Sequence, residues 1–318
     1  MHKSSTVAFD QPVNKEANVK EVLHGARLRE EVVDVAVLSA NFNNAHYLSA
    51  FIESIAASTV YPKQIIIVDD CSTDDSLAIL KDCVAKVANL DVICLERNVG
   101  FANALNCGLL HVNTRYVARI DPDDMIATSR LELQYRFLEQ NQSFSVVGSN
   151  VLYVNHDATK IVGKSNFPPD HHAIMQRYQR GEHGLVHGAC LFRSEIFQLV
   201  RYRQEYVPAE EYDLFSRIML CGYLAGNLTE NLTRVRIHDK SVSQYLPYDT
   251  VKKTFQLRDV FFATKTSGAY VLKEYIARYS YRRALCSAGI KKLLFMVIAS
   301  VLKPGAVIGR IKQFRVVK

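Results

Sequence analysis

Three carboxylates crowd the end of one apolar segment of this chain. The segment 115–120 (RYVARI) is followed within four residues by Asp121, Asp123 and Asp124. Negative charges so close together repel one another and lose hydration if they are buried, so the fold must compensate them. A divalent cation would do so, because Mg2+ binds carboxylate oxygens and completes its coordination with substrate phosphates. The alternative is a turn in which an Asp caps the helix predicted for the stretch 128–140.

Polar residues also come directly after the other apolar segments of the first half of the chain. Runs of β-branched and apolar residues predict strands at 32–39, 64–68, 91–95 and 115–120. Helical spacing and helix-start residues predict helices at 48–55, from Ser72–Thr73 onward, and at 101–112. This alternation predicts an α/β fold with a parallel sheet. Ligands bind at the carboxyl ends of such strands, where this sequence has ANFNN, DDCSTDD, ERNVG and DPDD.

The sequence lacks the glycine-rich loops that bind phosphate through backbone amides. No GxGxxG comes after a predicted strand, and the GKS at 163–165 is not a P-loop because Ala158 stands where the first glycine is required. A cation held by carboxylates is the other common way to bind a diphosphate. We therefore favour the cation over the capped turn.

Composition predicts a globular chain with an uneven charge distribution. The 318 residues are 48% hydrophobic, without a run of about 20 apolar residues that would span a bilayer. The seven cysteines are loosely spaced, which predicts reduced thiols, and no signal peptide is visible, so we expect a cytoplasmic protein. Residues 251–318 carry a net charge of +13, and the remainder carries −6. We expect a lead-in at 1–31 with weak helical character from Val19, an α/β domain at 32–245 and a basic helical region at 246–318.

The basic region has two interpretations. It either packs as a core helix with a solvated basic face, or its part 268–318 lies on anionic lipid at the inner face of the cell membrane. No nucleic-acid-binding motif accompanies the charge, so nucleic acid is not an expected partner.

Several blocks resemble, in order and spacing, a known family of enzymes. The blocks are VAVLSANFNNAHYLSAFIESI, QIIIVDDCSTDDSLAIL, RNVGFANALNCGL and YVARIDPDDMI, with weaker matches in HGACLFRSEIF, AEEYDLFSRIML and RVRIHDKSVS. They resemble the donor half of family 2 glycosyltransferases with the GT-A fold, over about residues 33 to 245. The resemblance implies a Rossmann-like nucleotide-binding sheet flanked by helices. It also implies transfer of a sugar from a nucleotide-diphosphate sugar to an acceptor hydroxyl.

The resemblance assigns a set of residues to the donor. They are Ala40, Asn41, Phe42, Asp70, Asn98, Gly100, Asn103 and Asp121. Phe42, where the family often has Tyr, would stack on the base, and Asp70 would recognise its edge, with uracil as the expected base. Asp69 would support the loop, and Cys71 stands where Gly is common in the family.

The resemblance also implies a metal site that uses Mn2+ or Mg2+. Asp121 and Asp123 match the metal-binding DxD of the family, with Asp123 as the direct ligand and Asp121 near the ribose or a metal-bound water. Asp124 would cap the helix expected after it. His238 is expected either as a metal or diphosphate ligand or as a surface residue, and His187 more as a packed residue than as a ligand.

The implied catalytic base is Glu211 of AEEYDL. The family usually has Asp at this position, so reach and angle differ here, and Glu210 is the second candidate, with Asp213 as a structural residue of the helix. The resemblance implies a single displacement that inverts the anomeric carbon. Because the chain has no Trp, the QxxRW motif of processive members is absent, so we expect addition of one or a few sugars.

The acceptor would be a saccharide or a lipid-linked saccharide, in the synthesis of cell-surface polysaccharide or glycolipid. Two other functions stay open from the sequence: a sugar nucleotidyltransferase, although 39–46 has no Lys or Arg, and a non-catalytic nucleotide-sugar-binding protein.

Overall fold

The computed structural model describes residues 19–24, 32–87, 89–238, 246–285, 287 and 289–303. They fall into two units, Met1–Arg236 and Ile237–Lys318, which are described separately. Of the lead-in expected at 1–31, the described part is β1 (Val19–His24), which pairs antiparallel with a strand of the sheet. The expectation of weak helical character from Val19 is therefore wrong, because pairing with a neighbouring strand overrides a weak local preference.

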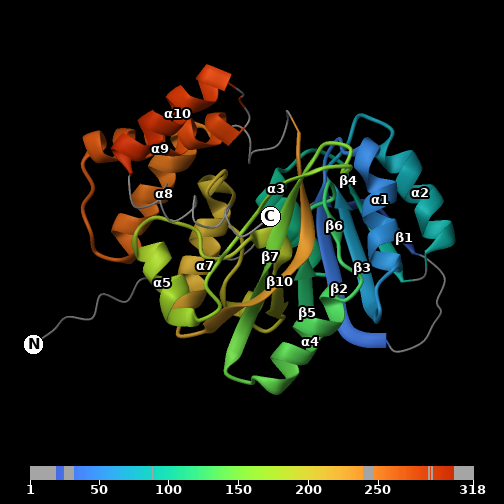
Figure 1. The fold of residues 1–318 in the computed structure, drawn as a ribbon. Helices are drawn as coiled ribbons and strands as arrows, with labels where there is room; N and C mark the ends of the chain where they lie inside the picture. Colours follow the sequence, from blue (N-terminus) through green and yellow to red (C-terminus); the bar gives the residue numbers. More distant parts are fainter. Residues whose placement is uncertain are drawn as a thin grey trace, which may run out of the picture. The chain divides into compact units, whose positions relative to one another are not determined.

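The first unit is built on a ten-stranded sheet (Figure 1). Its parallel part is β4-β3-β2-β5, formed by Val32–Asn41 (β2), Tyr61–Asp69 (β3), Leu90–Leu95 (β4) and Tyr116–Arg119 (β5). These are the four strands expected from the sequence. Their interiors are continuous apolar runs because helices cover both faces of a parallel sheet.

Antiparallel strands extend the sheet beyond β5. They are Met125–Ile126 (β6), Phe144–Asn155 (β7), Ile161–Lys164 (β8), Leu191–Arg193 (β9) and Leu224–Ile237 (β10). The full order is β1-β4-β3-β2-β5-β9-β7-β10-β6, and β8 pairs with β7. The predicted α/β fold is confirmed, with a mixed rather than a purely parallel sheet.

Helices lie on both faces of the parallel strands. The helices of this unit are Ala45–Ala56 (α1), Ser76–Lys86 (α2), Phe101–Leu109 (α3), Arg130–Gln140 (α4), His171–Gln179 (α5), Ile196–Leu199 (α6) and Glu210–Leu220 (α7), with 3-10 turns at His187–Ala189 (η1) and Gln204–Tyr206 (η2). Side chains at odd positions of β2 and β3 share a core with α1, α2 and α4. Because side chains alternate along a strand, the even positions face the other way. There Gly108 of α3 packs so closely that an added Cβ would lie 2.4 Å from Leu38 Cδ1.

The second unit is helical among its described residues. Its helices are Tyr248–Phe261 (α8), Gly268–Leu285 (α9) and Gly289–Leu302 (α10). Leu246, Val251, Phe255 and Val271 form its small core. In the part of the chain that the structure describes, no helix is both long and apolar enough to cross a membrane.

Candidate active site

A buried polar network closes the carboxyl ends of β2 and β3. Asn41 is fully buried, and its Nδ2 donates to Asp69 Oδ1 at 2.8 Å and to Ser72 Oγ at 3.1 Å. Ser72 in turn donates to Asp69 from its backbone N–H at 3.0 Å and from its hydroxyl at 2.6 Å. The expectation that Asp69 supports the loop is confirmed by these bonds. Asn41 is part of the same support, and its contact with the donor stays a prediction.

The two neighbours of Asn41 have opposite exposures. Ala40 is buried, whereas the ring of Phe42 is 45% exposed at the end of β2. Asn43, next in the chain, adopts a left-handed φ of +56° and accepts a hydrogen bond from Thr73 N–H at 2.8 Å. The turn therefore leaves an aromatic face open to a planar ligand.

Asp70 joins the loop after β3 to the turn that begins α3. Its two carboxylate oxygens accept hydrogen bonds from the backbone N–H groups of Val99 (2.7 Å) and Gly100 (2.9 Å). Asn98 Nδ2 donates to the Asp70 carbonyl at 3.1 Å. Burial raises the pKa of Asp70, and the two amide hydrogen bonds oppose that rise. The structure thus brings Asp70, Asn98 and Gly100 together, as a shared donor pocket requires.

Gln204 lies over the same turn, and no sequence motif singles it out. Its Oε1 accepts hydrogen bonds from the backbone N–H groups of Ala102 (3.0 Å) and Asn103 (3.3 Å), the first turn of α3. Gly100 has a φ of +89°, and a Cβ there would lie 2.4 Å from Gln204 Nε2. Gln204 therefore satisfies helix-terminal amides next to the residues assigned to the donor. No local motif marks it, because its contacts are about a hundred residues away in the sequence.

A buried arginine holds the first carboxylate of the acidic turn. Arg119 is 1% exposed, and its Nη2 donates to Asp121 Oδ1 at 2.5 Å. Its Nε and Nη1 have no hydrogen-bond partner among the described residues. The Arg119 guanidinium lies 5.1 Å from the ring of Phe101, the first residue of α3. The acidic turn and the start of α3 are therefore neighbours at one edge of the sheet.

Gly188 leaves room for the other oxygen of Asp121. A Cβ added to this residue of η1 would lie 2.4 Å from Asp121 Oδ2. The guanidinium of the buried Arg130, on α4, fixes this arrangement by donating to the Gly188 carbonyl at 2.9 Å and to the Arg119 carbonyl at 2.8 Å. Burial lowers the pKa of Arg130 to about 10, so it remains a cation at neutral pH. The backbone against which the Asp121 carboxylate packs is therefore held in place.

Asp124 does not cap a helix. It is buried and accepts a hydrogen bond from the backbone N–H of Arg236 at 2.9 Å, while Arg236 Nη1 donates to the Asp123 carbonyl at 2.8 Å. The next helix, α4, begins only at Arg130. The expectation that Asp124 caps it is wrong, because the short strand β6 intervenes and pairs with β10.

The acidic turn fits a divalent cation that shares its coordination with a ligand. Burial, followed by the charges of Asp123 and Asp121, raises the pKa of Asp124 well above its usual range, which leaves Asp121 and Asp123 as the candidate ligands of the turn. Among the described residues, no group of three or more His, Cys, Asp or Glu side chains could hold a metal alone. Two carboxylates completed by phosphate oxygens are the usual arrangement for Mg2+ at a nucleotide. His238 lies in the second unit, and its assignment stays a prediction.

The two candidate bases lie in the first turn of α7, where the helix dipole favours acids. Glu211 Oε1 lies 3.5 Å from His183 Nδ1, and its side chain is 35% exposed. Burial and then the charge of Glu211 raise the pKa of Tyr178. The charge of Glu210 instead raises the pKa of Tyr202, although burial is the main cause of that rise. The two glutamates therefore have different surroundings, and Glu211 has an imidazole beside it.

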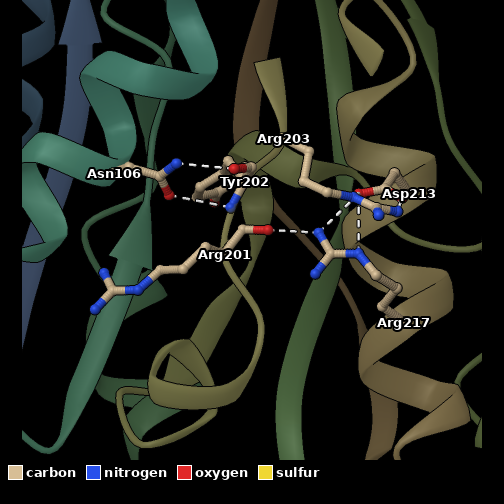
Figure 2. Close-up of polar contacts among 6 residues, drawn as sticks. All are labelled: Asn106, Arg201, Tyr202, Arg203, Asp213 and Arg217. Atoms are coloured by element: carbon tan, nitrogen blue, oxygen red, sulfur yellow. Dashed lines mark hydrogen bonds and ion pairs between the residues drawn. The ribbon is translucent and has the colours of Figure 1, made fainter. Parts of the chain in front are cut away.

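The loop before α7 is fixed between two helices (Figure 2). The buried Asp213 accepts hydrogen bonds from Arg203 Nε and Arg217 Nε, both at 3.0 Å, and Arg217 Nη2 donates to the Arg201 carbonyl. On the other side, Asn106 of α3 exchanges two hydrogen bonds with the backbone of Tyr202, at 2.8 and 3.0 Å. The expectation that Asp213 is a structural residue is confirmed.

His187 is a packed residue, as expected. It is buried, and its Nε2 lies 2.7 Å from the Tyr202 hydroxyl. Burial and then the charge of Arg119 hold the pKa of His187 well below its usual value. The imidazole is therefore neutral and helps to tie η1 to the loop that carries Gln204.

The sheet, with polar and acidic loops at one edge, defines the chain as an enzyme of the GT-A glycosyltransferase fold. TarS of S. aureus in complex with UDP-GlcNAc is similar, with a TM-score of 0.59 and 19% identity over 84% of this chain and 80% of that one. The mannosyltransferase PcManGT of Pyrobaculum calidifontis, in complex with GDP-Man and Mn2+, has a TM-score of 0.53 and 17% identity over 93% and 86% of the two chains.

The family is established by the sequence match. Residues 36–200 match the model of Glycosyl transferase family 2, and this chain belongs to that family. A relative in Escherichia coli, UDP-Glc:alpha-D-GlcNAc-diphosphoundecaprenol beta-1,3-glucosyltransferase WfaP, is 28% identical over 71% of this chain and 86% of its own length. The chain is therefore a glycosyltransferase, and neither a nucleotidyltransferase nor a non-catalytic binding protein is supported.

Proposed function

We propose that this chain is a metal-dependent, inverting glycosyltransferase that moves a sugar from a uridine-diphosphate sugar to an acceptor hydroxyl. The observation that carries the proposal is the pair of carboxylates, Asp121 and Asp123, beside the start of α3 and near the loops that hold Asp70. A carboxylate pair at the carboxyl edge of a nucleotide-binding sheet suits a diphosphate held through a cation.

The donor's base would lie on Phe42, and Asp70 would accept the N–H of its edge. The exposed ring of Phe42 supports stacking, and each oxygen of Asp70 keeps a lone pair beyond its one backbone bond. Asn98, Gly100 and Asn103 would line the pocket toward the sugar. UDP-GlcNAc in the structurally similar TarS supports uridine as the nucleoside.

Asp123, with Asp121, would hold the cation. When bound, Mn2+ or Mg2+ stabilises the negative charge that develops on the departing diphosphate. Arg119 orients the Asp121 carboxylate through their ion pair. Mn2+ together with GDP-Man in the structurally similar PcManGT supports this assignment.

Glu211 would accept the proton of the acceptor hydroxyl. The acceptor oxygen then forms its bond to the anomeric carbon as the bond to the diphosphate oxygen breaks on the opposite face, which inverts that carbon. A positioned base of this kind contributes about 10²–10⁴-fold to the rate. Glu210 is the alternative base, one residue earlier in α7.

The acceptor would be a saccharide or a lipid-linked saccharide, met at the cytoplasmic face of the membrane during polysaccharide or glycolipid synthesis. The name of the WfaP relative, which includes a diphosphoundecaprenol-linked acceptor, supports a lipid-linked one. The absence of Trp from the sequence supports transfer of one or a few sugars.

Release of nucleoside diphosphate from a panel of nucleotide sugars, with Mn2+ or chelator, tests this function. We expect acceptor-dependent release of UDP that stops in chelator, and a product anomer opposite to that of the donor. Glu211→Gln should retain donor affinity but lower kcat at least a hundredfold, whereas Glu53→Gln, a surface control on α1, should change neither. Retention of the donor's anomeric configuration, or full activity in chelator, would refute the proposal.

A further inference from the structure

One face of α10 exposes a continuous row of large apolar side chains. Ile290, Leu293, Leu294, Val297 and Val301 are between 51% and 86% exposed. Because successive residues of an α-helix are rotated by about 100°, these five side chains fall within an arc of about 100°. Ala299 points the opposite way and is buried. The helix therefore packs by one side and presents an apolar stripe on the other.

The sequence that contains this stripe carries only positive charge after Glu274. After Glu274 the sequence contains ten Lys and Arg residues and no Asp or Glu. Glu274 itself is buried and already paired, with Arg278 at 3.2 Å and with Lys303, just beyond α10, at 2.8 Å. Lys291 and Lys292, in the first turn of α10, form no ion pair with a described residue. Their charge is therefore available to an external partner.

We propose that this stripe, with Lys291 beside it, docks α10 flat on an anionic lipid surface. Lys291 lies about 60° beyond the edge of the arc, whereas Lys292 lies on the side of Ala299. An apolar arc flanked by Lys291 suits the lipid interface, where the acyl region takes the apolar side chains and a lipid phosphate takes the ammonium group. The 14 residues of α10 span about 21 Å, less than the ~30 Å of a bilayer core, so the helix lies along the surface rather than across it.

A second copy of this chain is a poorer occupant of the stripe. Two such faces would bring the Lys291 side chains of both copies close together, with no acidic residue after Glu274 to neutralise them. An anionic surface supplies the missing charge without any further group from the protein. The docking is independent of the proposed chemistry, although it would bring the enzyme to an acceptor anchored in lipid.

Co-sedimentation of the full chain with phosphatidylcholine vesicles, with and without phosphatidylglycerol, tests the proposal. We expect binding to the vesicles that contain phosphatidylglycerol, weakening as salt is added. Leu294→Ser with Val297→Ser should lower the partition coefficient at least tenfold. The control Ile161→Ser, on β8, removes an equally exposed side chain (59% against 57% for Leu294) and should bind like the wild type.

A second pair of variants tests the charge. Lys291→Gln should weaken binding about fivefold, whereas Lys164→Gln makes the same change of net charge on the first unit and should not. All variants replace exposed side chains, so melting temperatures should match. No binding to anionic vesicles, equal binding by the α10 variants, or a wild-type dimer that the Leu294 and Val297 variant abolishes would overturn the proposal.

Discussion

Substitution of Gly188 by Ala should disable the acidic turn while leaving every carboxylate in place. The new Cβ would lie 2.4 Å from Asp121 Oδ2, well inside the 3.0 Å that real Cβ atoms keep, so one group must move by more than half an ångström. Gly188 is held through its carbonyl by Arg130, and Asp121 is held by Arg119. The carboxylate is therefore the group that yields, and it turns away from its ion pair.

The size of the effect can be worked out from that displacement. A shift of about 1 Å in a positioned group can reduce activity about a hundredfold, which corresponds to roughly 2.7 kcal/mol of transition-state stabilisation. The buried Arg119 would lose its ion pair with Asp121, which adds some loss of folding stability. We expect kcat/KM for the donor to fall about a hundredfold and the Mn2+ concentration for half-maximal activity to rise.

Steady-state kinetics with varied donor and varied Mn2+ measure both effects, and a thermal melt reports the folded state. Gly268→Ala is the matched control, because nothing lies within 4 Å of a Cβ at that position. If Gly188→Ala kept the wild-type kcat/KM and Mn2+ dependence while folding normally, the position of Asp121 would not matter, and the assignment of this turn would be refuted.

Three further substitutions test other parts of the site. Gln204→Ala removes the acceptor of two α3 amides and should raise the donor KM several-fold, with Gln198→Ala on α6 as a control that leaves KM unchanged. Asp213→Asn should lower the free energy of unfolding in urea by about 3 kcal/mol, because two arginines lose their buried carboxylate; a loss under 1 kcal/mol would contradict that role. The pKa of His187 is lower in the folded state than in the unfolded state. Its contribution to stability is therefore present above the unfolded-state pKa of about 6.5 and is lost as pH falls below it. The loss is at most about 1.4 kcal/mol per pH unit. His187→Gln should flatten the dependence of unfolding free energy on pH between 7 and 5, and an unchanged slope would count against a buried neutral imidazole.

The parallel strands could be predicted because burial on both faces makes them continuous apolar runs. The run Gln64–Val68, for example, lies inside β3 with Ile65, Ile66 and Ile67 fully buried. Among the antiparallel strands, β6 has two residues and β9 has three, which is too few for a periodic pattern to predict them. Their positions depend on partners far away in the sequence.

Residues of the candidate site can be selected from the sequence only where their signal is local. Asp121 and Asp123 are recognisable because they cluster after a strand, and Asp213 because of its place in a helix. Arg119 is not recognisable from the sequence, because it lies among apolar residues of β5 and looks like part of the strand. Asp124 was wrongly assigned as a cap because a two-residue strand between it and α4 leaves no sequence signal.

The most direct test is a crystal structure of the chain with UDP and Mn2+, in which anomalous scattering locates the ion. We expect a single strong peak in contact with the Asp123 carboxylate and with oxygens of both phosphates, the uracil on Phe42 and Asp70 at its edge. UDP bound with its diphosphate away from the turn, or no ion beside Asp121 and Asp123, would contradict the assignment of the acidic turn to a cation and a diphosphate.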